Sequence, residues 1–122
     1  MEPLSLVIYH NDPGTARALE ASLSQHFGPV QLVRKYEEVQ SAISRQRAKV
    51  LVLDLEASRS GAVRNLHQEF PSLCIVATHR LADDELWTEA MNEGAADVCE
   101  PRKEQVLSSV MRERAHVAAA AA

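Results

Sequence analysis

Aromatic side chains, glycines and long apolar runs are all scarce in this chain, and each shortage argues against a class of protein. Phe, Tyr and Trp together make up 4% of the 122 residues, so few rings are available to flank a flavin. The four glycines form neither a Walker-type nor a dinucleotide-binding motif, which disfavours a nucleotide site. No apolar run approaches the length that a bilayer requires, so the sequence predicts no membrane-spanning helix.

Basic residues are also in the minority. The chain has 13 Lys and Arg against 17 Asp and Glu, a formal net charge of -4. A mildly acidic domain has no electrostatic attraction for nucleic acid or anionic membranes, so neither is an expected partner. The start, Met1-Glu2-Pro3, is acidic, whereas a secretory signal begins with basic residues. We therefore expect a cytoplasmic protein.

Cysteine is rare as well. The two cysteines, Cys74 and Cys99, each lie in an apolar run that is typical of a strand. This pattern predicts two buried thiols in a reducing compartment. A disulfide would require that the two strands are neighbours. The close paired spacing of a zinc site is absent.

Short apolar runs are the dominant positive feature, and an amphipathic helical stretch follows each of them. The runs span residues 4–9, 30–33, 50–55, 73–78 and 95–99. Their spacing of roughly twenty residues fits one strand, one helix and two short loops. Strands that alternate with helices pair in parallel through right-handed crossovers. The sequence therefore predicts an α/β fold of the (βα)5 type, a flavodoxin-like, doubly wound sheet of five parallel strands in the order 2-1-3-4-5.

The helical stretches have readable ends and faces. Asp12 is the expected N-cap of the first helix, and Asp83 or Asp84 that of the fourth. Trp87 and Met111 are among the apolar residues that helical spacing assigns to the core. We expect residues 1–117 to form one domain and residues 118–122 an alanine tail that either extends the last helix or frays, with no second domain.

Polar residues follow four of the five predicted strands, and in such a sheet the carboxyl ends of the strands carry the chemistry. The candidates are His10, Asn11, Asp12, Asp54, Glu56, Thr78, His79, Arg80 and Glu100. Asp54 directly follows a buried apolar run. It is either a cap for the next segment or a carboxylate nucleophile that takes up a phosphoryl group.

Four segments of this chain resemble the receiver domains of bacterial response regulators. They are LVIYHNDP, VLVLDL, CIVATH and GAADVCEP, in the family's order and near its spacing over almost the whole chain. The resemblance implies that Asp54 is the phosphoacceptor and Thr78 the switch hydroxyl. It also implies a signalling role in the cytoplasm, with a histidine kinase or another signalling protein as partner.

The chain departs from the receiver pattern at the positions that neutralise charge. The family's two metal-binding acids fall on His10 and Asn11, with Asp12 one step further on, and its lysine falls on Glu100. Imidazole is a poor ligand for Mg²⁺, and a carboxylate would repel a phosphoryl group. The aromatic switch position falls on Val98. These departures predict an atypical receiver, for which conventional Mg²⁺-dependent phosphorylation is not expected.

Three functions follow from these residues. The first is a non-enzymatic module that binds a protein partner through the fourth helix, fifth strand and fifth helix, a face that could also form a homodimer. The second is a phosphoacceptor in which a histidine kinase modifies Asp54 and Mg²⁺ is held by oxygen ligands from Asn11, Asp12, Asp54 and Glu56, with Arg80 or Lys103 as a substitute cation. The third is a metal-binding protein that uses His10 and His79 with Asp12 and Asp54.

Overall fold

The computed structural model describes the backbone of residues 4–121 and the side chains of residues 4–113. Strands and helices alternate as predicted. The elements are β1 (Leu6–Tyr9), α1 (Pro13–Phe27), β2 (Val30–Val33), the 3-10 turn η1 (Tyr36–Glu38), α2 (Val39–Gln46), β3 (Val50–Asp54), α3 (Ala62–Glu69), β4 (Cys74–Thr78), α4 (Asp84–Glu93), β5 (Asp97–Cys99) and α5 (Lys103–Ala121).

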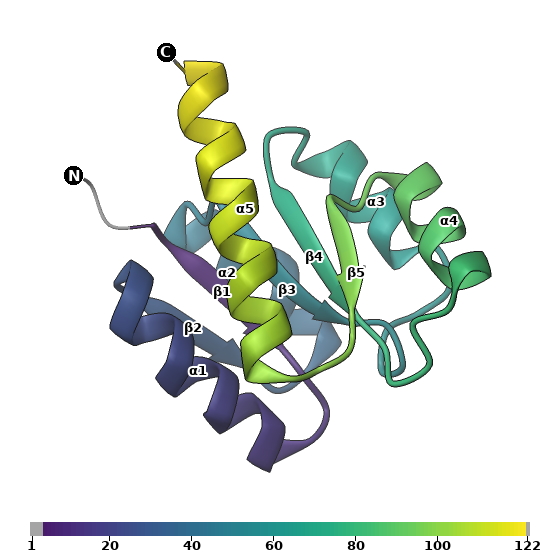
Figure 1. The fold of residues 1–122 in the computed structure, drawn as a ribbon, viewed down its shortest axis with the longest axis horizontal. Helices are drawn as coiled ribbons and strands as arrows, with labels where there is room; N and C mark the ends of the chain where they lie inside the picture. Colours follow the sequence, from purple (N-terminus) through teal and green to yellow (C-terminus); the bar gives the residue numbers. More distant parts are fainter. Residues whose placement is uncertain (1–3, 122) are drawn as a thin grey trace.

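The five strands form one parallel sheet in the order β2-β1-β3-β4-β5, which confirms the predicted topology (Figure 1). β3 lies at the centre, and all five of its residues are buried. Its run of Val and Leu packs on both faces of the sheet, as central parallel strands do. Each fully buried Leu or Val there contributes about 2 kcal/mol of hydrophobic stabilisation.

Helices cover both faces of the sheet, so the domain has two apolar layers. Leu19 of α1 and Val106 of α5 pack against one face of the sheet, in the same apolar cluster as Val52 of β3. α2, α3 and α4 pack on the opposite face, where Leu51 and Leu53 point. Figure 1 shows α1 and α5 side by side in front of the sheet. α5 continues through Ala121, so the helix extends across the predicted boundary between domain and tail.

The predicted helix caps are present. Oδ2 of Asp12 accepts the backbone N–H of Thr15 at the start of α1. Asp83, rather than Asp84, caps α4, because its Oδ1 accepts the backbone N–H of Leu86. Each cap satisfies one of the N–H groups that a helix leaves unpaired at its first turn.

Two predicted core residues are instead exposed. Trp87 has 44% and Met111 has 51% of its surface accessible. α4 lies over the short edge strand β5 and fully buries only Ala90, so Trp87 falls outside the covered stripe. On α5, Val106 and Val110 occupy the stripe that meets the sheet, and Met111 lies beside it. Helical periodicity therefore predicted which apolar residues share one side of a helix, but not how many of them the neighbouring elements bury.

The two cysteines do not form a disulfide. β4 and β5 are neighbours, but the register pairs Cys99 with Thr78 at the end of β4, whereas Cys74 begins that strand. Both thiols are free, as the register requires. Burial and the nearby carboxylates of Glu113 and Asp97 raise the pKa of the Cys74 thiol to about 12.

Among the helices of residues 4–121, none is both long and apolar enough to cross a bilayer.

Candidate functional site

Three candidate side chains form a row across the carboxyl edge of the sheet. Asp54 pairs in register with Thr78 on β4. On the other side of β3, Tyr9 pairs with Leu53, so His10 follows at the level of Asp54. Because successive side chains alternate between faces, the three point to the face that α1 and α5 cover. The hollow above this row has a volume of about 560 Å³ and is lined by His10, Asn11, Asp12, Thr15, Asp54, Glu56, Ala57, Arg80 and Pro101.

Asp54 is a buried carboxylate that is held by the backbone. Only 3% of its surface is exposed. Oδ2 accepts the N–H of Asn11 at 3.1 Å, and Oδ1 accepts the N–H of Glu56 at 3.0 Å. Two N–H donors stabilise a buried carboxylate, but they carry no net charge. Within residues 4–113, no Lys or Arg hydrogen bonds or pairs with this group.

His10 is the one titratable base beside Asp54 among the described residues. Its Nδ1 lies 3.7 Å from Oδ2 of Asp54, and the side chain is 8% exposed. Nδ1 also accepts the backbone N–H of Asp12 at 3.1 Å. Because Nδ1 accepts this hydrogen bond, it does not at the same time donate one to Asp54. Nε2 is buried and has no hydrogen-bond partner among the described residues.

Asp12 is directed at its own helix rather than at Asp54. Its Oδ2 accepts both the backbone N–H and the hydroxyl of Thr15, at 2.9 and 2.6 Å. These hydrogen bonds from Thr15 hold the pKa of Asp12 below its ordinary value. The carboxylate therefore serves as the N-cap of α1, and the predicted role as a metal ligand is not supported by its geometry.

The predicted metal ligands do not converge. Within the described part of the chain, no group of three or more His, Cys, Asp and Glu side chains is placed to hold a metal ion. The set of Asp12, Asp54 and Glu56 is therefore not assembled for Mg²⁺, nor is the histidine-containing set for a transition metal. His79 has its Nδ1 occupied by the backbone N–H of Leu81 at 2.9 Å. The donor set also fits poorly, because Mg²⁺ demands several hard oxygens in octahedral geometry.

The two cations that were expected to compensate, Arg80 and Lys103, do not pair with Asp54. Nε of Arg80 donates to Oε1 and Oε2 of Glu56 at 2.9 and 3.1 Å, and its backbone N–H donates to Oε2 at 3.3 Å. Partial burial raises the pKa of Glu56, but the hydrogen bonds from Arg80 outweigh it, and the pKa is lowered. Arg102 pairs with Glu100 at 3.3 Å. Lys103 lines a groove between α1 and α5 instead.

Thr78 and Val98 are the residues that the resemblance predicts at the two switch positions. Thr78 is fully buried beside Asp54, and its Oγ1 has no hydrogen-bond partner among the described residues. A hydroxyl next to the carboxylate is what the resemblance to receivers implied. Val98 is buried in the core layer under α4.

Tyr9 contributes an anchor that the sequence did not reveal. Its hydroxyl donates to the carbonyl of Ala57 at 3.0 Å, which ties the loop after Asp54 to β1. The ring meets Tyr36 edge-on at 5.9 Å, and the guanidinium of Arg59 lies 5.6 Å from the centre of the Tyr36 ring. Burial, and then the charge of Asp54, raise the pKa of Tyr9. Tyr9 and Ala57 are 48 residues apart, and nothing in the local pattern indicates their contact.

Comparison with known proteins rests on structure. No family model and no curated protein sequence matches the chain. Solved structures do match. The signal receiver domain of the DNA-binding response regulator MerR from Colwellia psychrerythraea 34H has a TM-score of 0.81 at 14% identity, covering 93% of this chain and 98% of that one. A response regulator from Thermotoga maritima has a TM-score of 0.80 at 20% identity, covering 92% and 97%.

The BeF3-activated N-terminal receiver domain of Klebsiella pneumoniae RstA is also similar, with a TM-score of 0.76 at 20% identity, covering 88% of this chain and 95% of that one. The chain has the receiver fold. Both alignments cover more than nine-tenths of this chain and of the matched chain. At these identities the likeness establishes the receiver fold alone. What this member of the fold does must be argued from its own site.

Proposed function

We propose that this chain is a signalling module of the receiver type that acts by binding a protein partner. In this proposal it is not an enzyme and does not use conventional Mg²⁺-dependent phosphorylation of Asp54. The observation that carries the proposal is the surroundings of Asp54. The carboxylate is buried among neutral donors, and the nearest ring nitrogen presents a lone pair toward the backbone N–H of Asp12.

Charge balance supports this proposal. Phosphoryl transfer depends largely on positioning and on neutralising the charge of the transferred group. The mouth of the hollow carries the carboxylates of Asp12 and Glu56, and its only guanidinium among the lining residues, that of Arg80, is paired with Glu56. A phosphoryl group on Asp54 would replace the single negative charge of the carboxylate with about two, without a free cation to balance them. Such an adduct would be disfavoured.

The partner surface is expected on α4, β5 and α5. Leu81 and Trp87 are exposed near the start of α4, at 73% and 44%. An exposed Trp is a common anchor in protein interfaces because it buries a large apolar area and keeps a polar handle. The exposed carboxylates of Glu85 and Glu89 lie on the same helix. A partner that presents an apolar pocket rimmed by Lys or Arg would match this face.

The second candidate, a phosphoacceptor receiver, keeps one supporting observation. Asp54 and Thr78 are still adjacent at the carboxyl edge of the sheet. The receiver domain of RstA is described as activated by BeF3, and this chain shares its fold. If the adjacent carboxylate and hydroxyl were sufficient, this chain would accept a phosphoryl group in the same place.

Incubation with acetyl phosphate and Mg²⁺, followed by intact mass spectrometry, separates the two candidates. The proposal predicts that the wild-type chain gains no phosphoryl group. The Asp54→Asn variant is the matched control, because it keeps the shape of the side chain but cannot form the acyl phosphate. A mass gain in the wild type that disappears in this variant would overturn the proposal and support the phosphoacceptor.

A further inference from the structure

The charges around Asp54 do not balance within the described part of the chain. Three carboxylates, those of Asp12, Asp54 and Glu56, line the hollow at the carboxyl edge of the sheet. The guanidinium of Arg80 also lines it, but pairs with Glu56. Asp12 is exposed to solvent, whereas Asp54 is only 3% exposed. A buried carboxylate without a cation is costly, so Asp54 is the group here that a positive charge would stabilise most.

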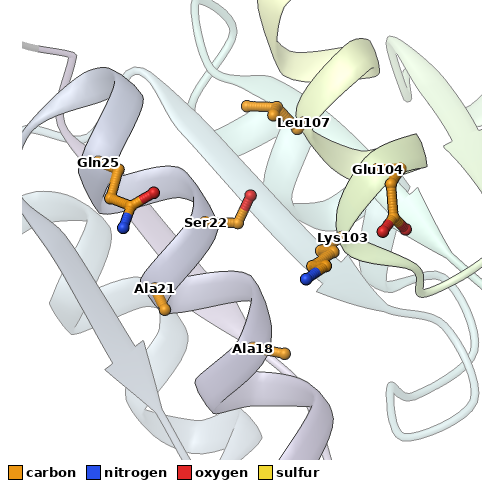
Figure 2. A pocket seen from close by; sticks show the side chains of 7 residues that line it. All are labelled: Ala18, Ala21, Ser22, Gln25, Lys103, Glu104 and Leu107. Carbon is orange, nitrogen blue, oxygen red and sulfur yellow. The ribbon is translucent and has the colours of Figure 1, made fainter.

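Two other cations that lie near this edge in the sequence are also held elsewhere. Arg102 pairs with Glu100. Lys103 lines a groove of about 350 Å³ between α1 and α5, and Figure 2 shows it on the first turn of α5 beside Glu104. This groove shares no lining residue with the hollow at Asp54. Within residues 4–113, the charge of Asp54 is therefore left without a Lys or Arg partner.

Two buried polar groups beside Asp54 have no hydrogen-bond partner among the described residues. The side chain of His10 lines the hollow and is 8% exposed, and its Nε2 has none. The hydroxyl of the fully buried Thr78, which pairs in register with Asp54, also has none. Buried polar groups are nearly always hydrogen-bonded. A water molecule could satisfy either group, but it would not supply the missing positive charge.

The carboxylate of Asp54 has one acceptor position left on each oxygen. Oδ2 accepts the N–H of Asn11 and Oδ1 that of Glu56, and a carboxylate oxygen can accept two hydrogen bonds. A guanidinium presents two parallel N–H donors that match the two oxygens of a carboxylate. It also remains protonated when it leaves water, whereas a lysine ammonium loses its proton more readily. Arginine is therefore the cation that suits this carboxylate best.

We propose that the hollow at Asp54 receives an arginine side chain from a partner protein, which rests on the protein-binding function proposed above. The guanidinium donates to both oxygens of Asp54, and Ala57 and Pro101 offer apolar surface to its alkyl stem. The hollow, at about 560 Å³, has room for this side chain. The partner thus contacts the carboxyl edge of the sheet, at a site separate from the exposed Trp87 on α4.

NMR titration of the nitrogen-15-labelled chain with the peptide acetyl-Gly-Arg-Gly-amide tests this site without the partner itself. EDTA in the buffer removes metal ions. The amides of Asn11 and Glu56 report on binding directly, because both donate to Asp54. We expect both signals to shift, with a dissociation constant in the millimolar range. The matched peptide with neutral citrulline in place of arginine is expected to bind at least about tenfold more weakly.

Three variants locate the peptide. Asp54→Asn keeps the shape of the side chain but removes its charge, so it is expected to lose the arginine-dependent shifts. Arg80→Gln removes a competing cation and frees Glu56, so it is expected to bind the peptide more tightly. Trp87→Ser changes only the α4 face and should leave the titration unaltered. The dispersion of each spectrum shows whether the variant is folded.

Several outcomes would overturn the inserted arginine. Asn11 and Glu56 amides that do not shift would do so, as would equal responses to the arginine and citrulline peptides. A lysine peptide that binds as tightly as the arginine peptide would rule out the guanidinium fork. Tighter binding of ethylguanidine, which has the same charge but no peptide backbone, would identify a small free guanidine as the ligand. None of these outcomes alters the acetyl phosphate experiment, which tests the proposed function separately.

Discussion

Nδ1 of His10 lies 3.7 Å from Oδ2 of Asp54 while it accepts the backbone N–H of Asp12. The imidazole thus approaches the carboxylate without donating a hydrogen bond to it. An acidic residue at position 10 would supply an oxygen ligand instead, and a metal ion could then bridge it to Asp54. The ring nitrogen at position 10 therefore deprives the site of one hard oxygen ligand for Mg²⁺.

Restoring the missing charges should restore the chemistry. The variant His10→Asp/Asn11→Asp/Glu100→Lys supplies two carboxylates for Mg²⁺ and a cation for the phosphoryl oxygens. We expect it to gain one phosphoryl group from acetyl phosphate in a Mg²⁺-dependent way, as measured by intact mass. The same three changes combined with Asp54→Asn are the control and should gain none. A triple variant that remains unmodified would mean that something other than charge blocks the site.

The Asp12 cap should make part of the stability depend on pH. The hydrogen bonds from Thr15 lower the pKa of Asp12 below its ordinary value of 3.8. A carboxyl group whose pKa is lower in the folded state stabilises the fold above its unfolded pKa, and this stabilisation is lost as the pH falls through the folded value. We expect Asp12→Ala to lower the urea midpoint at pH 7 and to lower it less near pH 3.

Asp83→Ala removes the other aspartate cap and is a useful comparison for the size of the effect at neutral pH. It is expected to cost about 1 kcal/mol of unfolding free energy. An Asp12→Ala variant whose deficit is the same at pH 7 and pH 3 would contradict the role of the charged cap.

The free thiols should be unreactive in the folded chain. Burial, followed by the charge of Asp97, raises the pKa of Cys99 to about 12 from an ordinary value of 9.0. At pH 8 this leaves roughly a thousandth of the usual thiolate, which is the reactive form. We expect labelling of the native protein by a thiol reagent to be slower than in urea by about that factor. Labelling of Cys99 at the unfolded rate would contradict the packing of β5 against α5.

Gly94 should be intolerant of any side chain. It ends α4 with φ at 118°, and a Cβ atom there would lie 2.5 Å from Cγ of His67. Gly94→Ala is expected to lower the free energy of unfolding by about 2 kcal/mol, from backbone strain and from the clash. Adding His67→Ala removes the clash but not the strain, so the double variant should recover part of the loss. Strictly additive effects would show that the two residues do not meet.

Much of the fold could be predicted from apolar periodicity. β3 is a continuous buried run, and its neighbours repeat at a spacing that only alternating strands and helices explain. The caps by Asp12 and Asp83 depend on contacts within three residues, so local sequence contains their signal. The exposure of Trp87 could not be read in this way, because it depends on how little of α4 the three-residue strand β5 covers.

The sequence was sufficient to locate the site, but not to predict which of its side chains contact one another. The strand ends identified His10, Asp54 and Thr78, because parallel strands place their carboxyl ends at one edge. Which groups pair there depends on side-chain orientation and loop geometry. Arg80 could have approached Asp54, but it meets Glu56, and Asp12 faces Thr15 rather than a metal. Arg80 and Glu56 are 24 residues apart, so no local pattern indicates that they meet.

Fluorine NMR with beryllofluoride and Mg²⁺ tests the central claim most directly, because beryllofluoride mimics a phosphoryl group on an aspartate without requiring a transfer step. The account predicts that wild type shows only the signals of free beryllofluoride species, whereas the His10→Asp/Asn11→Asp/Glu100→Lys variant shows bound ones. Bound signals in the wild type that vanish in Asp54→Asn would contradict it, since the unaltered site would then hold the metal and the phosphoryl mimic together.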